Sequence, residues 1–492
     1  MKPLTEANQP AGPTRRVVIV GGGIAGLSTA WYVQTLAARA GLALHYTLLE
    51  AGDRWGGKIA TEHIGGFGET PFVVECGPDA FLTRKPWAYN LTRELGLADS
   101  ILGVNQATHG TYVAWGGQLV PLPEGMPLLV PTKLGPFLRS PLFTPLGKLR
   151  LLLEPLIPAR HEPGDESVAA FVRRRLGGEA LDRLAEPLLG GIYNSDVETQ
   201  SLRATFPQFA ALEDTHGSLL RGTRAMRAKA QATSPALPPF FSFPGGAQTL
   251  VETLVPKLTG DLRLNANVQS IERGDTGYRV ALASGEVINA DAVVLATPAR
   301  IAGRLLRGVA GKAADELAVM RSSSIGALSL GFRRADVPHP MGGHGIVIPR
   351  VERRRIDGVS WSSSKWVGRA PSGYALIRVF FGGPNSSATM ALDDAGVLQV
   401  VRHELRDLMG ISAEPVFSHI RRWQEAYPEY AVGHLERIAG IDAQLPPGIV
   451  LAGSAYRGIG VPDCIHQGQC AAGVILKSLA AFNPDHTMEL KT

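Results

Sequence analysis

A cluster of glycines directly after a short apolar run constrains this chain more than any other feature. Residues 17–20 read VVIV, and Gly21, Gly23 and Gly26 follow in the spacing GxGxxG. In a strand-to-helix turn with this spacing, the first glycine permits the tight turn and the second lets a diphosphate approach backbone N–H groups. The third lets the helix pack closely on the strand. The positive end of the helix dipole attracts the same diphosphate. The segment therefore predicts a dinucleotide cradle.

The residues around these glycines fit a β-α-β unit. Residues 17–20 predict a buried parallel strand, residues 24–39 a helix, and residues 45–49 a second strand that ends at Glu50. A carboxylate at this strand end can accept hydrogen bonds from ribose hydroxyls. Glu50 lies further from Gly21 than the usual spacing of about 20 residues, so the helix and its loop must be longer than minimal. The alternative is a tight turn followed by a surface glutamate.

A second glycine pair decides between the two common dinucleotides. Residues 50–58 read EAGDRWGGK. An NAD-binding fold needs no second glycine loop here, whereas FAD extends to an isoalloxazine ring and needs further backbone contacts. Near the C-terminus, Gly453, Gly458 and Gly460 let backbone pass against a flat ring. A helix then begins at residues 461–463, with proline in its first turn. Its N–H groups can stabilise negative charge on the ring, so both segments predict FAD.

The bulk composition excludes several classes of protein. The 492 residues predict two or more domains, and 45% hydrophobic with 19% charged residues is an ordinary globular balance. The formal net charge is +5, without a clustered basic stripe, so no nucleic-acid partner is expected. The excess suits an acidic small molecule or an anionic membrane surface.

The cysteines and the apolar runs indicate a cytoplasmic protein. Cys76, Cys464 and Cys470 contain no CxxC pair and cannot form a disulfide framework. The first fifteen residues lack the apolar region of a secretory signal, and no apolar run reaches the length of a membrane span. The Pro- and Leu-rich stretch 121–159 predicts short broken helices. Its leucines could touch a membrane surface, although packing in a core is the favoured alternative.

Longer sequence blocks identify the family that the chain resembles. EAGDRWGGK resembles the second signature of the flavin amine-oxidase and porphyrinogen-oxidase superfamily. Five further blocks are similar to the oxygen-dependent porphyrinogen oxidases of haem synthesis, most closely the Gram-positive type. They are PTKLGPF (131–137), EPLLGGIYNSDVETQSL (186–202), TFPQF (205–209), RWQEAYPEYAVGH (422–434) and GVPDCIHQG (460–468).

This resemblance implies a six-electron oxidation of a porphyrinogen to a porphyrin in haem biosynthesis. For the Gram-positive type, coproporphyrinogen III and three O₂ give coproporphyrin III and three H₂O₂. Protoporphyrinogen IX is the alternative substrate. A flavin amine oxidase or a carotene desaturase is a more distant alternative, and a prenylated-GTPase dissociation inhibitor is the non-enzymatic one. The next haem-synthesis enzyme stays open as a partner, and a monomer and a homodimer are both open.

The same resemblance implies an α/β fold with a Rossmann-like FAD-binding domain, an α+β substrate domain and a helical insertion. The FAD-binding domain is expected from residues 15–80, 240–305 and 431–485, and the substrate domain from 81–120 and 306–430. Residues 121–230 form the insertion. Within residues 165–185 we expect a helix with Asp165 or Ser167 as N-cap.

The cofactor contacts are expected in the two glycine loops, in the segment ECGPDAF (75–81) and in the C-terminal loop, with Val268 and Trp423 beside them. The FAD is expected to be non-covalent, since no cysteine precedes Cys464 in that loop. These residues are Gly21, Gly22, Gly23, Ile24, Ala25, Gly26, Glu50, Ala51, Arg54, Gly57, Lys58, Gly77, Pro78, Asp79, Ala80, Val268, Trp423, Gly453, Gly460, Val461, Pro462 and Asp463.

The substrate needs an apolar slot and cations for its propionates. The family match suggests Gly190, Gly191, Ile192 and Tyr193 for the slot, and we add Val347 and Trp361 as ring contacts. Arg84, Lys85 and Lys365 are the candidate propionate partners. In several relatives an arginine after the segment matching residues 94–97 binds a propionate, but none stands there in this chain. No catalytic side chain and no metal are expected, because pyrrole protons can pass to water.

Overall fold

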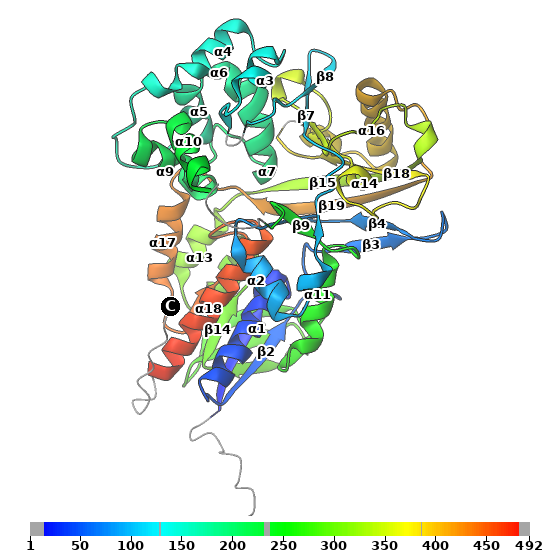
Figure 1. Ribbon diagram of the computed structural model, residues 1–492. Coiled ribbons are helices and arrows are strands. Elements are labelled where there is room, and N and C mark those ends of the chain that lie inside the picture. Colours follow the sequence, from blue (N-terminus) through cyan, green and yellow to red (C-terminus); the bar gives the residue numbers. More distant parts are fainter. Residues whose placement is uncertain (1–13, 127–128, 231–236, 385, 482–492) are drawn as a thin grey trace, which may run out of the picture.

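The computed structural model describes residues 14–126, 129–230, 237–384 and 386–481 (Figure 1). A parallel sheet with its helices forms one end of the molecule, and a group of short helices around α4 forms the other (Figure 1). A long, mostly antiparallel sheet lies between them and carries α16 on its outer side (Figure 1). This arrangement agrees with the predicted α/β class.

The parallel sheet has the order β10-β2-β1-β14-β20. Every neighbouring pair in it is parallel. The sheet is covered on one face by α1 (Ile24–Arg39) and α18 (Val461–Ala481), which pack against each other. Its strands are β1 (Arg15–Val20), β2 (Leu44–Leu49), β10 (Asp261–Arg263), β14 (Ala292–Leu295) and β20 (Ile449–Leu451).

Local sequence explains the first β-α-β unit. The apolar half of β1 is buried, as expected for a strand covered on both faces. The turn into α1 brings the start of the helix against the end of the strand: a Cβ on Gly26 would overlap the carbonyl oxygen of Gly21. Gly21 itself has φ of 109°, which favours glycine. The predicted helix over 24–39 and both predicted strands are confirmed.

The long sheet has the order β19-β15-β18-β17-β16-β7-β8. Its pairs are antiparallel, except that β16 and β7 are parallel. One face packs on α16 (Asp394–Met409) in an apolar core. The strands are β7 (Tyr112–Trp115), β8 (Gln118–Pro121), β15 (Ser322–Arg333), β16 (Gly345–Val347), β17 (Gly358–Ser360), β18 (Tyr374–Phe381) and β19 (Phe417–Pro428).

Smaller sheets and further helices complete the fold around the parallel sheet and the long sheet. Their strands are β3 (Thr61–Ile64), β4 (Phe72–Glu75), β5 (Phe81–Leu82), β6 (Leu102–Gly103), β9 (Phe240–Ser242), β11 (Val268–Arg273), β12 (Tyr278–Leu282) and β13 (Val287–Ala290). Their α-helices are α2 (Pro86–Glu94), α11 (Gln248–Leu254), α12 (Ala299–Leu306), α13 (Gly311–Ala318), α14 (Ser362–Lys365), α15 (Ser387–Met390) and α17 (His434–Gln444). Short 3₁₀ turns occupy Ala98–Ser100, Val255–Lys257, Arg334–Asp336 and Arg350–Glu352.

The central block is helical, as predicted. It contains α3 (Leu134–Arg139), α4 (Pro145–Leu152), a 3₁₀ turn (Glu154–Leu156), α5 (Val168–Arg175), α6 (Gly178–Ala180), a π-helix (Leu181–Gly190), α7 (Gly191–Tyr193), α8 (Leu202–Thr205), α9 (Pro207–His216) and α10 (Leu219–Ala230). No helix in the described parts of the chain combines the length and the apolar character needed to cross a bilayer.

The helix expected over 165–185 is only partly right. Ser167 caps α5, because its hydroxyl accepts the N–H of Ala170 at 3.1 Å. Asp165 does not cap this helix; its carboxylate accepts hydrogen bonds from Ser201 and Arg203 instead. The helix also breaks at Gly177, where φ is 95°. Asp165 thus makes hydrogen bonds to residues distant in the sequence, where a local helix-capping bond was expected.

The predicted division into segments needs two changed boundaries. All strands of the parallel sheet fall within 15–80, 240–305 and 431–485, and we propose to keep these segments as the core of the nucleotide domain. We propose to move the boundary at 81, because α2 packs on α18 in the core of that domain. We propose to move the boundary at 305 as well, because α13 packs on α12 and α17. The substrate sheet starts only at β7 and resumes at β15.

A buried ion-pair network holds the helical insertion together. The guanidinium of Arg175 is fully buried, as is Glu154, with which it pairs. It also lies 3.2 Å from Glu213 and donates to the backbone oxygens of Ile157 and Gly217. Removing one member of such a network leaves charge buried without a partner, which costs more than the pair contributes.

We expect Arg175→Leu to lower the free energy of unfolding by about 3–5 kcal/mol. Arg173→Leu is the matched control on the same helix. Arg173 pairs with Glu198 where both side chains are half exposed, so its loss should cost about 0–1 kcal/mol. Urea unfolding of both variants beside the unaltered protein measures the difference. Equal effects would contradict the importance of the buried network.

Candidate active site

The first glycine loop and Glu50 form one wall of the site. The N–H of Gly22 donates to Glu50 Oε2 at 2.6 Å, and the N–H of Gly52 donates to Oε1 at 2.8 Å. Each carboxylate oxygen can accept a further bond, so Glu50 remains able to bind ribose hydroxyls. The backbone oxygen of Glu50 accepts the N–H of Ala266, which brings Val268, the first residue of β11, close to this wall.

The second glycine loop lies directly on the first. The N–H of Gly56 donates to the oxygen of Gly22 at 2.8 Å. A Cβ on Gly57 would lie 3.0 Å from the Cα of Gly23, and a Cβ on Gly77 would overlap the backbone oxygen of Lys58. The loops containing Gly23 and Gly57 and the segment of Gly77, Pro78 and Ala80 are therefore stacked backbone on backbone.

Two basic side chains tie the second loop to its surroundings. Arg54 donates to the backbone oxygens of Gly57 and Ile59, while the neighbouring Ala51 is exposed. The ammonium of Lys58 donates to the backbone oxygen of Ala426 in β19 and to Ser454 Oγ. Burial lowers the pKa of Lys58. Lys58 thus joins the nucleotide domain, the long sheet and the C-terminal loop.

The C-terminal loop is held by residues that the sequence analysis did not single out. The hydroxyl of Tyr430 donates to the oxygen of Ser454 at 2.7 Å and accepts the N–H of Gly458 at 2.8 Å. The ring of His434 stacks on Tyr430 and also contacts the oxygen of Tyr456 at 2.7 Å. Both residues lie in RWQEAYPEYAVGH, so the family block was the available signal. Gly453 at the start of the loop lies against Ala25 of α1.

The start of α18 carries an ion pair. Val461, Pro462 and Asp463 are buried there, beside Gly460. The ammonium of Lys85 lies 2.7 and 2.6 Å from the two oxygens of Asp463. The prediction of Lys85 as a propionate partner therefore needs correction, because its charge is already engaged within the protein.

A second ion pair engages another predicted cation. Lys365 Nζ lies 2.9 Å from Asp79 Oδ2, and the indole N–H of Trp366 donates to the same oxygen at 3.3 Å. Burial by itself would raise the pKa of Asp79, but Lys365 and Arg378 outweigh it and hold that pKa at about 2. Lys365 is likewise not free for a propionate, whereas Arg84 is exposed.

The predicted slot lies where the π-helix ends. Gly190 is buried, Gly191 and Ile192 are exposed, and Tyr193 is buried with its hydroxyl donating to Thr205. A π-helix at this position fits a functional segment. Val347 and Ile459 pack against the same apolar cluster as Tyr193. The slot residues, the long sheet and the C-terminal loop therefore meet.

Trp361 does not belong to this group. Its side chain is fully buried in the core between the long sheet and α16, with the rings of Tyr112 and His339 around it. The expectation of a ring contact at Trp361 is wrong for this conformation. Side chains alternate between the two faces of a strand, so the face to which Trp361 points depends on where the preceding strand β17 ends. The sequence did not show that end.

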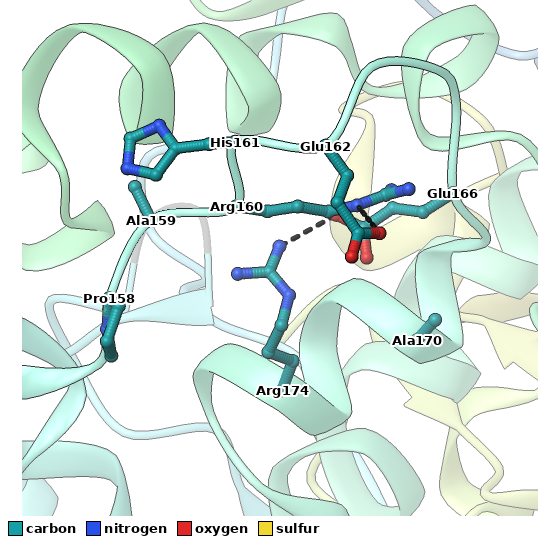
Figure 2. A pocket seen from close by; sticks show the side chains of 8 residues that line it. All are labelled: Pro158, Ala159, Arg160, His161, Glu162, Glu166, Ala170 and Arg174. Atoms are coloured by element: carbon teal, nitrogen blue, oxygen red, sulfur yellow. Dashed lines mark hydrogen bonds and ion pairs between the residues drawn. The ribbon is translucent and has the colours of Figure 1, made fainter.

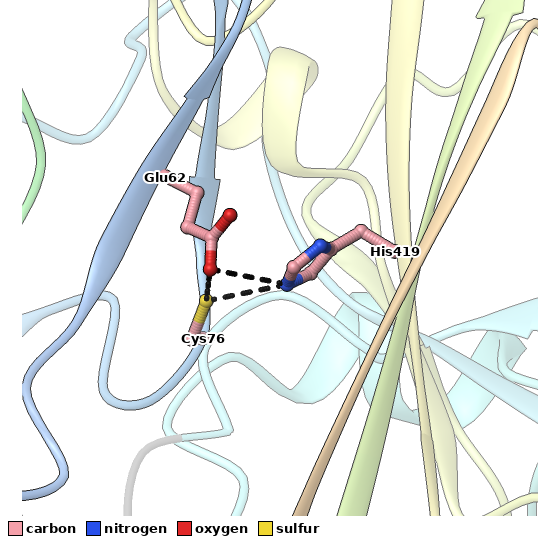
Figure 3. Close-up of side chains that lie close together, drawn as sticks. All are labelled: Glu62, Cys76 and His419. Atoms are coloured by element: carbon pink, nitrogen blue, oxygen red, sulfur yellow. Dashed lines mark hydrogen bonds and ion pairs between the residues drawn. The ribbon is translucent and has the colours of Figure 1, made fainter.

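Three possible metal ligands meet beside the site, although no metal was expected. Figure 3 shows Glu62 of β3, His419 of β19 and Cys76, which directly follows β4, pointing toward one another. The sulfur of Cys76 lies 3.6 Å from His419 Nε2 and 3.9 Å from Glu62 Oε1. Burial, and then Glu62, raise the pKa of the Cys76 thiol to about 11. A protonated thiol donating within the cluster accounts for the contact. Trp423 anchors the same segment, because its indole N–H donates to the Cys76 oxygen at 2.7 Å.

A surface cavity of about 420 Å³ lies elsewhere, on the helical insertion (Figure 2). Its lining contains none of the residues expected to bind cofactor or substrate. Arg174 in this cavity pairs with Glu166 and Glu213, so its charge is compensated. We assign the cavity no part in the site.

The cradle fits a dinucleotide on the geometry of this chain. α1 begins at Gly23 without a side-chain cap and without an acidic residue in its first turn. The first N–H groups of the helix, from Ile24 to Gly26, are therefore left for an anionic group. Glu50 stands at the ribose position, and the stacked glycine loops continue from there to α18. The ring of Trp55 lies over Gly22 in this conformation, since a Cβ on Gly22 would come within 2.5 Å of it.

Comparison with known proteins adds the family. A family described as flavin containing amine oxidoreductase matches residues 24–476. The chain is similar to the coproporphyrinogen III oxidase of Bacillus subtilis (strain 168), with 35% identity over 472 residues, 94% of this chain and 98% of that protein. The enzyme of the same name from Staphylococcus aureus is 32% identical over 95% of this chain and 100% of its own length. A solved structure of a candidate protoporphyrinogen oxidase from Exiguobacterium sp. 255-15 has a TM-score of 0.82 and 32% identity, covering 95% of this chain and 99% of that one.

Proposed function

The chain belongs to the flavin containing amine oxidoreductases, and within that family we propose that it oxidises coproporphyrinogen III to coproporphyrin III. The observation that carries this proposal is the similarity to coproporphyrinogen III oxidases over nearly the whole of both chains. It extends through the helical insertion and the long sheet, which lie outside the parallel sheet and its glycine loops, and therefore supports the substrate as well as the cofactor.

FAD is the flavin that the cradle suits. The N–H groups at the start of α1 would hold its diphosphate, Glu50 would bind the ribose, and the N-terminus of α18 would stabilise negative charge on the ring. When bound, FAD supplies a two-electron acceptor that O₂ reoxidises. The role of the chain is to hold the macrocycle against the ring and to keep bulk water away.

The groups around the ring position are suited to this passive role. Burial raises the pKa of Cys464 to about 12, and burial also raises the pKa values of Tyr193 and Tyr430. All three side chains stay neutral near pH 7 and form an uncharged wall. None acts as a base or nucleophile, which agrees with an oxidation whose pyrrole protons pass to water.

Two alternatives share this fold. Protoporphyrinogen IX would react by the same route. The similar structure of a candidate protoporphyrinogen oxidase supports this alternative substrate. It carries two vinyl groups where coproporphyrinogen III carries propionates. An amine oxidase would instead need a small amine in the site; the solved structures of putrescine oxidase and cyclohexylamine oxidase are 18% and 16% identical to this chain and share its fold.

Peripheral membrane contact is a further part of the proposal. The large apolar residues from Leu134 to Leu156 divide into two sets. Phe137, Leu142 and Leu151 are among the buried ones, as the core alternative predicted. Several others are exposed, led by Leu146 at 78%. Lys133 and Arg139 stand beside them, and Lys148 of α4 reaches the backbone oxygen of Leu138 in α3. Exposed leucines with flanking cations suit an anionic lipid surface.

We expect acid precipitation of the purified yellow protein to release all of its flavin as FAD. The reason is that Cys464 lies within α18 and is buried, so the C-terminal loop offers no sulfur for a covalent link. Chromatography of the supernatant beside FAD and FMN standards identifies the cofactor. Flavin that stays on the denatured chain would contradict this expectation.

With coproporphyrinogen III in air, we expect fluorescent coproporphyrin III and three H₂O₂ per porphyrin. The kcat/KM for this substrate should exceed that for protoporphyrinogen IX by roughly 10- to 150-fold. One carboxylate–arginine contact contributes about 1.5–3 kcal/mol when the competing vinyl leaves the arginine unpaired. Both porphyrinogens and a peroxide assay measure this. A preference for protoporphyrinogen IX would overturn the substrate, and no porphyrin from either would overturn the function.

We expect the protein to sediment with phosphatidylglycerol vesicles. Changing both Leu146 and Leu156 to serine should weaken this binding, because the variant loses apolar contact with the lipid. Burying a leucine contributes about 1.5–3 kcal/mol, so the double variant should bind at least tenfold more weakly. Val319→Ser is the matched control, since Val319 is also exposed but lies beside α13. Equal binding by all three proteins would rule out this surface.

A further inference from the structure

Arg378 is a buried guanidinium without a hydrogen-bond partner in the described parts of the chain. Its side chain is 6% exposed, and its Nε is buried and unpaired. The ring of Phe380 lies under the guanidinium at 4.8 Å. Burying a cation is costly unless an anion compensates it, so the position of Arg378 needs an explanation.

Arg378 points away from the core of the long sheet, toward the nucleotide domain. In β18 the residues on either side of it, Ile377 and Val379, face the core with α16. Successive side chains of a strand alternate between faces, so Arg378 faces the other way. Leu376, on that same face, packs against Phe72 of β4 in the nucleotide domain. Arg378 therefore lies on the face that closes over the site.

Arg421 lies on the same face. In the sheet, Ala327 of β15 stands opposite Phe380 of β18 on one side and opposite Arg421 of β19 on the other. Phe380 and Arg378 are two residues apart on one strand, so all three side chains share a face. The guanidinium of Arg421 stacks on the ring of Trp423 at 4.6 Å, and its Nε is also buried and unpaired.

The charges around these arginines leave a positive surplus. Asp79 is close enough for Arg378 to help lower its pKa, but its hydrogen bonds go to Lys365 and Trp366. Glu75 is paired with Arg369, and Glu62 is half exposed beside His419. Asp79 thus faces Lys365 and Arg378, while Arg378 and Arg421 both lie near the Cys76 thiol, which carries no charge to compensate them.

We propose that Arg378 binds a carboxylate of the substrate, with Arg421 available for a second carboxylate on the same face. This inference rests on the proposed function, because coproporphyrinogen III brings four propionates into the site. A guanidinium can hold a carboxylate with two parallel hydrogen bonds. The diphosphate of the cofactor does not serve as the missing anion, since its place is the N-terminus of α1 at the far end of the cradle.

The test compares two porphyrinogens on FAD-loaded enzyme in one detergent buffer. Coproporphyrinogen III carries four carboxylates, and etioporphyrinogen carries alkyl groups alone. We expect Arg378→Met to lower kcat/KM for coproporphyrinogen III by roughly 10- to 150-fold, mainly by raising KM. The kcat/KM for etioporphyrinogen should change by no more than about twofold. Arg378→Lys should recover part of the loss. Arg333→Met, at the exposed end of β15, should change neither value.

Every outcome decides between the two proposals. An equal loss on both substrates, or no loss on coproporphyrinogen III, overturns the role of Arg378 and leaves the function intact. An unaltered enzyme that oxidises neither porphyrinogen overturns the function instead. Flavin absorbance of each variant shows whether the cradle is preserved. If Arg378→Met does not hold flavin, Arg378→Lys and Arg421→Met are measured in its place. The inference then requires that kcat/KM falls for coproporphyrinogen III and not for etioporphyrinogen.

Discussion

The close approach of backbone to backbone at the glycines is the constraint on which the rest of the site depends. Gly26 against Gly21, Gly57 against Gly23 and Gly77 against Lys58 leave no room for a Cβ. These contacts stack three turns within residues 21–77 on one another, and the start of α1 beside them has no side-chain cap. An elongated dinucleotide can then lie along main chain alone, which explains why so few side chains are needed to hold it.

Three lysines then join the parts of the site. Lys58 donates to the backbone of β19 and to Ser454, whereas Lys85 and Lys365 form ion pairs with Asp463 of α18 and with Asp79. Each pair joins parts that belong to different segments of the sequence, and each uses a cation that would otherwise be available to the substrate. Positioning the cofactor and recognising carboxylates therefore draw on the same kind of residue, and the cations left unpaired are those that remain for the substrate.

Local sequence pattern predicted the secondary structure around the glycine loops, but it did not show which cations pair within the protein. The first β-α-β unit and the start of α18 follow from glycine spacing, strand hydrophobicity and a proline in the first turn, all of which act within a few residues. Lys85 and Lys365 looked free because their partners Asp463 and Asp79 are hundreds of residues away in the chain. Trp361 looked available because the face of a short strand cannot be assigned without its pairing. Arg378 carried a signal that went unused: a charged residue in the middle of the apolar strand ALIRVFF.

Charge placement separates the two tasks of the site. The wall near the ring is neutral, since Tyr193, Tyr430 and Cys464 all keep their protons at pH 7. A neutral wall does not hold the macrocycle in one orientation, because its pyrrole core presents similar edges on all sides. Its carboxylates are what distinguish those edges. Under the proposed function, the cations on one face of the long sheet would therefore orient the substrate, and the preference between propionate and vinyl substituents would follow from the same arrangement.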